Sequence, residues 1–237
     1  MAELTIRFTW KVETPLHVGT GMSRAGYVDR VVRSHDGRPY LPGDAVKGAI
    51  RGSAERLYHW LVPTAKPEAD DEKSSLPRNG VLCRIFAPEA LKASTYAEPA
   101  ASSAAYRFPP SLSLDPAKTD RSASTRIDSE TGAAMGHTLR FIERWVRVET
   151  FPIAIEASGG DWAREPDFLD LQFLFMAVLC ADAVGGKRGI GYGRVEIRGL
   201  PAILAGIDRA TLAERATVEA VRSHLQRWEP DCKNDEL

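Results

Sequence analysis

The alternation of apolar and polar residues near the start of the chain predicts a half-buried β-strand over residues 4–13. Its apolar positions are Leu4, Ile6, Phe8, Trp10 and Val12. Further strands are predicted over residues 40–41, 139–148, 150–157 and 194–200, and residues 27–32 are apolar and β-rich but interrupted at Asp29 and Arg30. An Asp36-Gly37 pair between the two short stretches is typical of a hairpin turn.

Apolar residues recur at helical spacing in three segments, which predict helices over residues 44–61, 167–184 and 212–228. The first helix follows Leu41-Pro42-Gly43, and Asp44 is placed to cap its N-terminus. Its apolar stripe consists of Ala45, Val46, Ala49, Ile50, Ala54, Leu57, Tyr58 and Leu61. The order of strands and helices predicts an α+β fold, an antiparallel sheet with two helices on one face, of the ferredoxin-like type.

Charge is unevenly distributed along a chain whose formal net charge is only −1 over 237 residues. Lys and Arg outnumber acids in residues 24–56 and 185–198, whereas acids gather at 68–72 and after residue 228. Many nucleic-acid-binding proteins are basic overall, so the net charge counts mildly against that class. Local basic segments with acidic flanks nevertheless fit a groove for a polyanion.

Cysteine usage and hydropathy exclude several other classes. Cys83, Cys180 and Cys232 have no CxxC or Cys–His spacing, so a zinc site is not expected and two of them are predicted to be buried free thiols. The N-terminus lacks a signal pattern, and no apolar run is long enough to span a bilayer. A cytoplasmic protein is therefore expected.

Two cations lie near the start of the first predicted helix. Lys47, Arg51 and Glu55 are spaced at i, i+4 and i+8, so they share a face that differs from the apolar stripe. Two cations beside the N–H groups of a helix N-terminus would suit a polyphosphate backbone. The alternative is an ordinary amphipathic helix with surface charges.

A glycine-rich segment with cations, residues 185–194, is the strongest signal for ligand binding. Its sequence is Gly-Gly-Lys-Arg-Gly-Ile-Gly-Tyr-Gly-Arg. Closely spaced glycines let backbone N–H groups approach a phosphate, and Lys187, Arg188 and Arg194 add charge. The segment follows a helix and precedes a strand, which excludes a dinucleotide or Walker motif. A tight helix-to-strand turn is the alternative.

Asp29 and His17 are candidates for chemistry. Asp29 is predicted to lie in a glycine-flanked loop, either as a cap or solvated charge or as a carboxylate ligand to Mg²⁺, which needs one or two carboxylates plus phosphate oxygens. His17, between Pro15 and Gly19, is expected to be exposed enough to touch a ligand and to act as a general acid or base.

Taken in order, these motifs resemble the RAMP superfamily of CRISPR-associated proteins over about residues 4–198. The motifs are Thr14-Pro-Leu-His-Val-Gly-Thr-Gly, Asp29, Tyr40-Leu-Pro-Gly-Asp-Ala-Val-Lys-Gly-Ala-Ile-Arg, Cys83-Arg-Ile-Phe, Thr125-Arg-Ile-Asp-Ser-Glu-Thr-Gly and the segment 185–194. Their order is most similar to the repeated backbone subunit of type III effector complexes.

The resemblance implies one domain over residues 1–228, with a modified RNA-recognition fold, a thumb hairpin in an insert of about 88–148, and an acidic tail at 229–237. It implies binding to a guide RNA and a target RNA, and assembly with further copies of itself and other subunits. The residues that would contact RNA are His17, Lys47, Arg51, Arg126, Met135, Gly186, Lys187, Arg188, Tyr192 and Arg194.

Asp29 matches the position of the family's catalytic aspartate, which cleaves target RNA with a divalent ion such as Mg²⁺. The resemblance thus implies a metal-dependent endoribonuclease that acts within the assembled complex. Two alternatives stay open: a scaffold subunit that does not cleave, and a nuclease that processes repeat RNA through His17 without metal.

Overall fold

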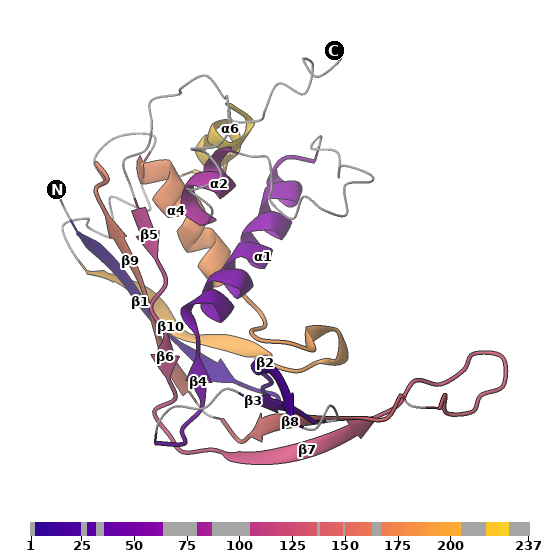
Figure 1. The fold of residues 1–237 in the computed structure, drawn as a ribbon. Helices are drawn as coiled ribbons and strands as arrows, with labels where there is room; N and C mark the ends of the chain where they lie inside the picture. Colours follow the sequence, from indigo (N-terminus) through magenta and orange to yellow (C-terminus); the bar gives the residue numbers. More distant parts are fainter. Residues whose placement is uncertain are drawn as a thin grey trace.

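The computed structural model describes residues 3–24, 28–31, 36–63, 80–86, 105–136, 138–148, 150–162, 167–204 and 217–227, with the backbone alone for 21–24, 28–30 and 200–204 (Figure 1). The strands are β1 (Leu4–Val12), β2 (Gly19–Arg24), β3 (Val28–Val31), β4 (Tyr40–Leu41), β5 (Ala105–Arg107), β6 (Ser111–Leu112), β7 (Lys118–Ser124), β8 (Arg140–Val146), β9 (Thr150–Ser158) and β10 (Val195–Leu204). The helices are α1 (Gly43–Leu61), α2 (Gly80–Phe86), α4 (Asp167–Leu179) and α6 (Val218–Arg227), with one 3₁₀ turn, η1 (Arg188–Ile190).

The main sheet has the strand order β10-β1-β9-β5, and its strands pair antiparallel. The predicted strand over 4–13 is confirmed as β1, and its alternating residues are the buried ones. Trp10 faces Phe151 of β9 and Ile197 of β10, so one apolar layer crosses three strands. This order, with α1 after β1 and α4 after β9, is consistent with a ferredoxin-like fold.

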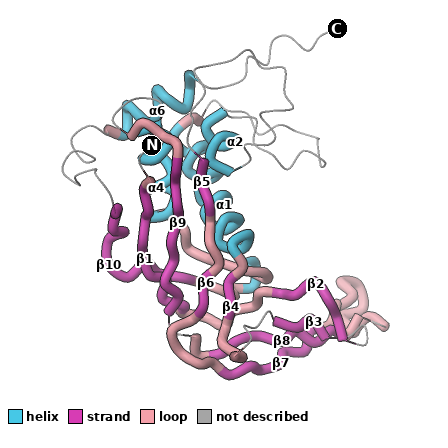
Figure 2. Tube along the Cα trace, turned by 60° about the vertical axis from the view of Figure 1, so that its left-hand side comes forward, coloured by secondary structure: helices cyan, strands magenta, loops and turns pink. Residues whose placement is uncertain are grey.

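Helices cover one face of this sheet, with α1 packed against both α4 and α2 (Figure 2). The predicted apolar stripe of α1 is buried, apart from the half-buried Ala45. The predicted cap is wrong, because α1 begins at Gly43 with Pro42 in the capping position, and the Pro42 carbonyl accepts the first amide bonds. Asp44 lies in the first turn instead, where a negative charge still complements the helix dipole.

Helix lengths and the segment 81–86 differ from the predictions. Helix α4 ends at Leu179 rather than at residue 184, because the chain then turns and Val184 donates its amide to the Gly193 carbonyl at 2.8 Å. Residues 81–86, for which no helix is predicted, form most of α2, and all six side chains are buried. Helix α6 confirms the C-terminal part of the last predicted helix, whereas residues 212–216 and 228 lie outside the described part.

A second sheet has the order β2-β3-β8-β7. Strand β3 pairs in parallel with β8, although the two strands are far apart in the sequence. Strand β8 in turn pairs antiparallel with β7. Strands β7 and β8 extend into a long hairpin whose tip projects away from the rest of the molecule (Figure 1). A hairpin is therefore present within residues 88–148, and its role as a thumb stays a prediction.

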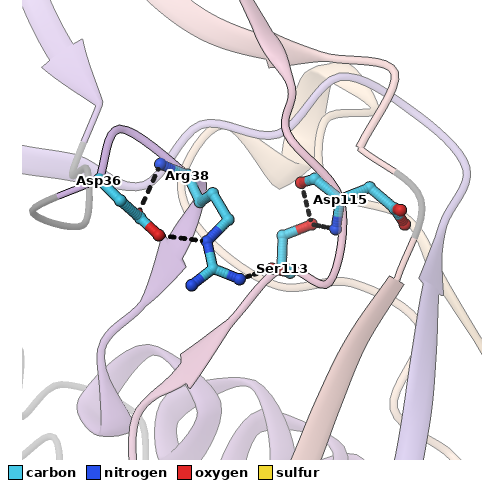
Figure 3. A network of polar contacts seen from close by, with 4 residues as sticks. All are labelled: Asp36, Arg38, Ser113 and Asp115. Carbon is cyan, nitrogen blue, oxygen red and sulfur yellow. Dashed lines mark hydrogen bonds and ion pairs between the residues drawn. The ribbon is translucent and has the colours of Figure 1, made fainter.

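A polar network fixes the chain just before α1 (Figure 3). The backbone amide and the Nε of Arg38 both donate hydrogen bonds to the Asp36 carboxylate. The Nη1 of Arg38 donates to the Ser113 carbonyl at 3.5 Å. The Ser113 amide donates to Pro39, and β4 pairs with β6 next to it. The Asp36-Gly37 turn is thus bound to the β6 segment, and this holds β4 and the start of α1 in place.

The thiols only partly follow the prediction. Cys83 is a buried free thiol, as expected, but Cys180 is exposed because α4 ends at the preceding residue. Cys232 lies outside the described residues. None of the helices that the structure describes is long and apolar enough to cross a membrane.

Candidate nucleic-acid interface

Helix α1 presents its two cations on one face, as predicted. Arg51 donates its Nε to the Glu55 carboxylate at 2.7 Å, one helical turn further on. Lys47 lies one turn before Arg51 and is half-buried. Such a partly exposed pair at i, i+4 stabilises a helix by only about 0.3–0.5 kcal/mol. The ion pair is therefore weak enough for an arriving phosphate to compete with Glu55.

The glycine-rich loop, residues 185–194, is closed at its base by backbone contacts. Gly186 donates its amide to the His17 carbonyl at 2.7 Å, and Gly193 donates to the Pro15 carbonyl at 2.9 Å. A Cβ on Gly193 would lie 1.9 Å from the Val184 carbonyl oxygen, at a φ of +71° that side chains rarely adopt. Glycine is therefore required at this position for the fold of the turn. This agrees with the alternative interpretation of the segment as a tight helix-to-strand turn.

The tip of the loop differs from the predicted amide nest. The amides of Ile190, Gly191 and Tyr192 all donate to carbonyls within the loop, and Gly186 is bonded at the base. These amides, including that of Gly186, are therefore not available to a phosphate in this conformation. Lys187 and Arg188 are exposed, so their side chains are the groups that a polyanion would meet.

The loop and α1 bring the two basic segments together. The Nη1 atom of Arg188 lies 3.7 Å from the position that a Cβ on Gly52 would occupy, so the Arg188 guanidinium lies against α1 at the residue that follows Arg51 in the sequence. Arg56 and Asp182 form an ion pair at 2.8 Å between α1 and the turn that precedes the loop. Lys47, Arg51, Lys187 and Arg188 are referred to below as the cationic cluster.

Tyr192 and Arg194 connect the loop to neighbouring strands. The Tyr192 hydroxyl accepts a hydrogen bond from Nη1 of Arg144 on β8 at 2.8 Å, and the guanidinium lies 5.5 Å from the centre of the Tyr192 ring. Arg194 donates its amide to the Thr14 hydroxyl at 2.9 Å, and its side chain is exposed. Arg194 is thus placed to contact a ligand, whereas Tyr192 is part of a protein contact.

The expectation that His17 is exposed is wrong. Only 6% of this residue is accessible, and its Nδ1 donates to the Glu143 carbonyl at 2.7 Å. Its own carbonyl receives the Gly186 amide. His17 therefore holds the base of the glycine-rich loop against β8, and burial removes it from contact with a ligand in this conformation.

Asp29 lies in a strand, so its predicted loop position is wrong. Its backbone is in β3, paired with Ser23 of β2 and with Ile142 of β8. The prediction failed because β3 pairs with β8, which is distant in the sequence. Such long-range pairing leaves no signal in the residues around Asp29. The carboxylate of Glu143, on the same strand β8, is buried and accepts the Val31 amide at 3.2 Å.

The donor set near β3 limits how a metal could be held. Within the residues that the structure describes, no three His, Cys, Asp or Glu side chains form a group that could hold a metal ion. Mg²⁺ in many phosphoryl-transfer sites is bound by one or two carboxylates and by substrate phosphate oxygens. The Asp29 side chain is outside the described part of the structure, so a divalent ion at Asp29 stays a prediction.

The tip of the β7–β8 hairpin is a hydrogen-bonded turn. Met135 donates its amide to the Arg126 carbonyl at 2.9 Å, and Ile127 bridges Ala134. The Asp128 carboxylate accepts bonds from the amides of Thr131 and Glu130 and from the Thr131 hydroxyl. These bonds hold the pKa of Asp128 below its ordinary value. Arg126, Ile127 and Met135 are exposed, so two apolar side chains and a cation project from an ordered tip.

Several residues that shape this interface were not predicted. Arg144 links the glycine-rich loop to the hairpin, Glu143 links β8 to β3, and Asp182 links the turn that precedes the loop to α1. Each of these residues is one polar residue in an alternating or irregular segment, and its partner is distant in the sequence. The sequence carries no signal from which these contacts could have been found.

Comparisons with known proteins identify a family. The family model described as "RAMPs: RAMP superfamily" matches residues 9–196, which include the end of β1, all of α1, the β7–β8 hairpin (residues 118–146) and the glycine-rich loop. No curated protein matches the chain.

Proposed function

The chain belongs to the RAMP superfamily of CRISPR-associated RNA-binding proteins, and from that premise we propose that it is a guide-RNA-binding backbone subunit of a type III-like effector complex that cleaves paired target RNA. Further copies of the chain and other subunits are its proposed partners. RNA binding is a property of this family, whereas the place in the complex and the cleavage are proposed for this chain.

The observation that carries the proposal is the convergence of two basic segments that are far apart in the sequence. Arg188 of the loop lies against α1 at Gly52, and α1 itself carries Arg51 and, one turn earlier, Lys47. Lys and Arg side chains can neutralise phosphates without regard to the base sequence. Such cations suit the uniform phosphates of an RNA backbone. The guide strand would therefore be held by its phosphates, which leaves its bases directed towards a target.

We take the β7–β8 hairpin as the thumb hairpin, which would act on the paired guide and target RNA strands. Ile127 is 55% exposed and Met135 is also exposed at the tip, although large apolar side chains usually avoid water. Apolar side chains on a projecting element can enter between bases and unstack them. The bonds of Asp128 order this tip in advance, which lowers the conformational entropy lost on binding.

Cleavage is proposed at Asp29. A divalent ion bound there would stabilise charge on the scissile phosphate and orient the attacking group. The pairing of β3 with β8 fixes the backbone at Asp29, and the buried Glu143 carboxylate accepts the Val31 amide of the same strand, which supports a defined place for this residue. The nuclease alternative through His17 has less support, since His17 is buried and its Nδ1 is bonded.

Target cleavage by the assembled complex tests the catalytic part. We expect cleavage of a labelled target RNA with Mg²⁺ present, and loss of cleavage with EDTA or with Asp29→Asn, while guide and target binding are retained. Asp44→Asn is the matched control, because it removes one exposed carboxylate from the first turn of α1 and should cleave normally. Full cleavage by the Asp29→Asn complex would exclude the catalytic role, and a parent complex that binds target without cleaving it would be a scaffold.

A further inference from the structure

Arg144 on β8 makes polar contacts with two different parts of the interface. Its Nη2 donates to the Asp120 carboxylate on β7 at 2.9 Å, and its Nη1 donates to the Tyr192 hydroxyl at 2.8 Å. Asp120 is its direct partner across the β7–β8 pair, so this contact belongs to the stem of the thumb hairpin. Tyr192 belongs to the glycine-rich loop. One guanidinium thus joins the stem and the loop.

The geometry uses the particular shape of the arginine side chain. A guanidinium carries donors in a planar fork, so it can serve two acceptors in fixed directions and also lie over an aromatic ring. Lysine could approach one of these acceptors as a point charge but not both in this arrangement. Hydrogen bonding to Arg144 holds the pKa of Asp120 below its ordinary value, and hydrogen bonding to Asp120 raises that of Arg144. Both groups therefore stay charged at neutral pH.

We propose that Arg144 is a positioning residue that fixes the glycine-rich loop relative to the thumb hairpin, so that the two contact RNA as one unit. This inference rests on the proposed RNA-binding function and adds the residue that sets the spacing between phosphate contacts and thumb. The base of the loop is independently bonded to His17 and Pro15. Loss of Arg144 should therefore release the tip of the loop while the fold is kept.

The first test measures the link without RNA, by amide hydrogen exchange in the full chain. Arg144→Ala and Tyr192→Phe should each raise exchange at residues 189–192 by about five- to tenfold, the size expected when one or two hydrogen bonds are lost. Arg144→Lys should restore only part of the protection. Arg140→Ala is the control, because it removes an exposed cation four residues away on the same strand. Unchanged exchange in Arg144→Ala would overturn the link.

The second test measures coupling in the function. Affinities of a fluorescent single-stranded RNA of mixed sequence for the parent, Arg144→Ala, Tyr192→Phe and the double variant form a cycle. A shared role predicts that the double variant loses no more than about twofold beyond Arg144→Ala alone. Fully additive losses would overturn the coupling. If the parent binds no RNA, the proposed function fails, whereas the exchange experiment still decides whether the link exists.

Discussion

Replacement of Asp170 by alanine should destabilise the protein strongly. The Asp170 side chain is fully inaccessible and accepts Nε and Nη2 of Arg84, each at 2.7 Å. It also accepts Nε2 of His224 at 2.7 Å. These three residues come from α4, α2 and α6, so one buried carboxylate joins three helices. Its removal would take two charge-assisted hydrogen bonds from the Arg84 guanidinium, which is only 8% exposed.

The expected size follows from burial. Breaking a buried ion pair by removing one partner costs about 3–5 kcal/mol, because a charge stays desolvated without compensation. For a chain of this length, 1 kcal/mol lowers Tm by roughly 2–4 °C, so Asp170→Ala should lower it by about 6–20 °C. Asp182→Ala is a matched control. It also removes an aspartate bonded to arginine, at 2.8 Å, but the two side chains are 57% and 72% exposed. The control should cost less than about 1 kcal/mol.

Thermal and urea unfolding, followed by circular dichroism, measure both variants against the parent. Limited proteolysis should cut Asp170→Ala first near α6, since this helix loses a tether to α4. Equal Tm values for Asp170→Ala and Asp182→Ala would refute the reasoning, because they would mean that burial of the carboxylate does not determine its contribution.

Three other outcomes are expected. Since Asp128 has a pKa below its ordinary value of 3.8, its bonds should stabilise the thumb tip above that pH and be lost as the pH falls further; amide exchange at the tip against pH measures this, and Asp128→Asn should abolish the pH dependence. Burial raises the pKa of the Cys83 thiol, partly offset by Arg51 and Arg84, so iodoacetamide should modify it at least about tenfold more slowly than the exposed Cys180, as read by peptide mass spectrometry; equal rates would contradict the burial. Gly193→Ala should lower Tm and RNA affinity because its Cβ would clash with the Val184 carbonyl, whereas Gly189→Ala, in open space, should leave the fold intact; a neutral Gly193→Ala would show that the loop can be rebuilt.

The sequence predicted those elements whose periodicity reflects burial. Strand β1 and helix α1 each have one face in the core, so the periods of two and 3.6 residues are clear in their sequences. Helix α2 was missed because all its side chains from Val81 to Phe86 are buried, which leaves no polar face to reveal a period. The strand position of Asp29 was missed because its partner on β8 is far away in the sequence.

The candidate site was predictable by composition but not by contact. The excess of cations near Arg51 and Arg188 was visible, and the structure places these segments together. The use of the loop amides within the turn was not visible, since it depends on carbonyls of His17 and Pro15 from another part of the chain. For the same reason His17 appeared accessible in the sequence, although Glu143 and the loop enclose it.

The salt dependence of RNA affinity tests the central claim most directly. If the cationic cluster binds phosphates, affinity should be insensitive to RNA sequence and should fall steeply with salt, and each lost phosphate contact should reduce the log–log slope by about one. The double variant Lys47→Ala/Arg51→Ala should therefore have a slope about two units smaller than the parent. A double variant at the exposed Arg222 and Arg227 of α6 should keep the parent slope. A Lys47→Ala/Arg51→Ala protein with the affinity and slope of the parent would contradict the account.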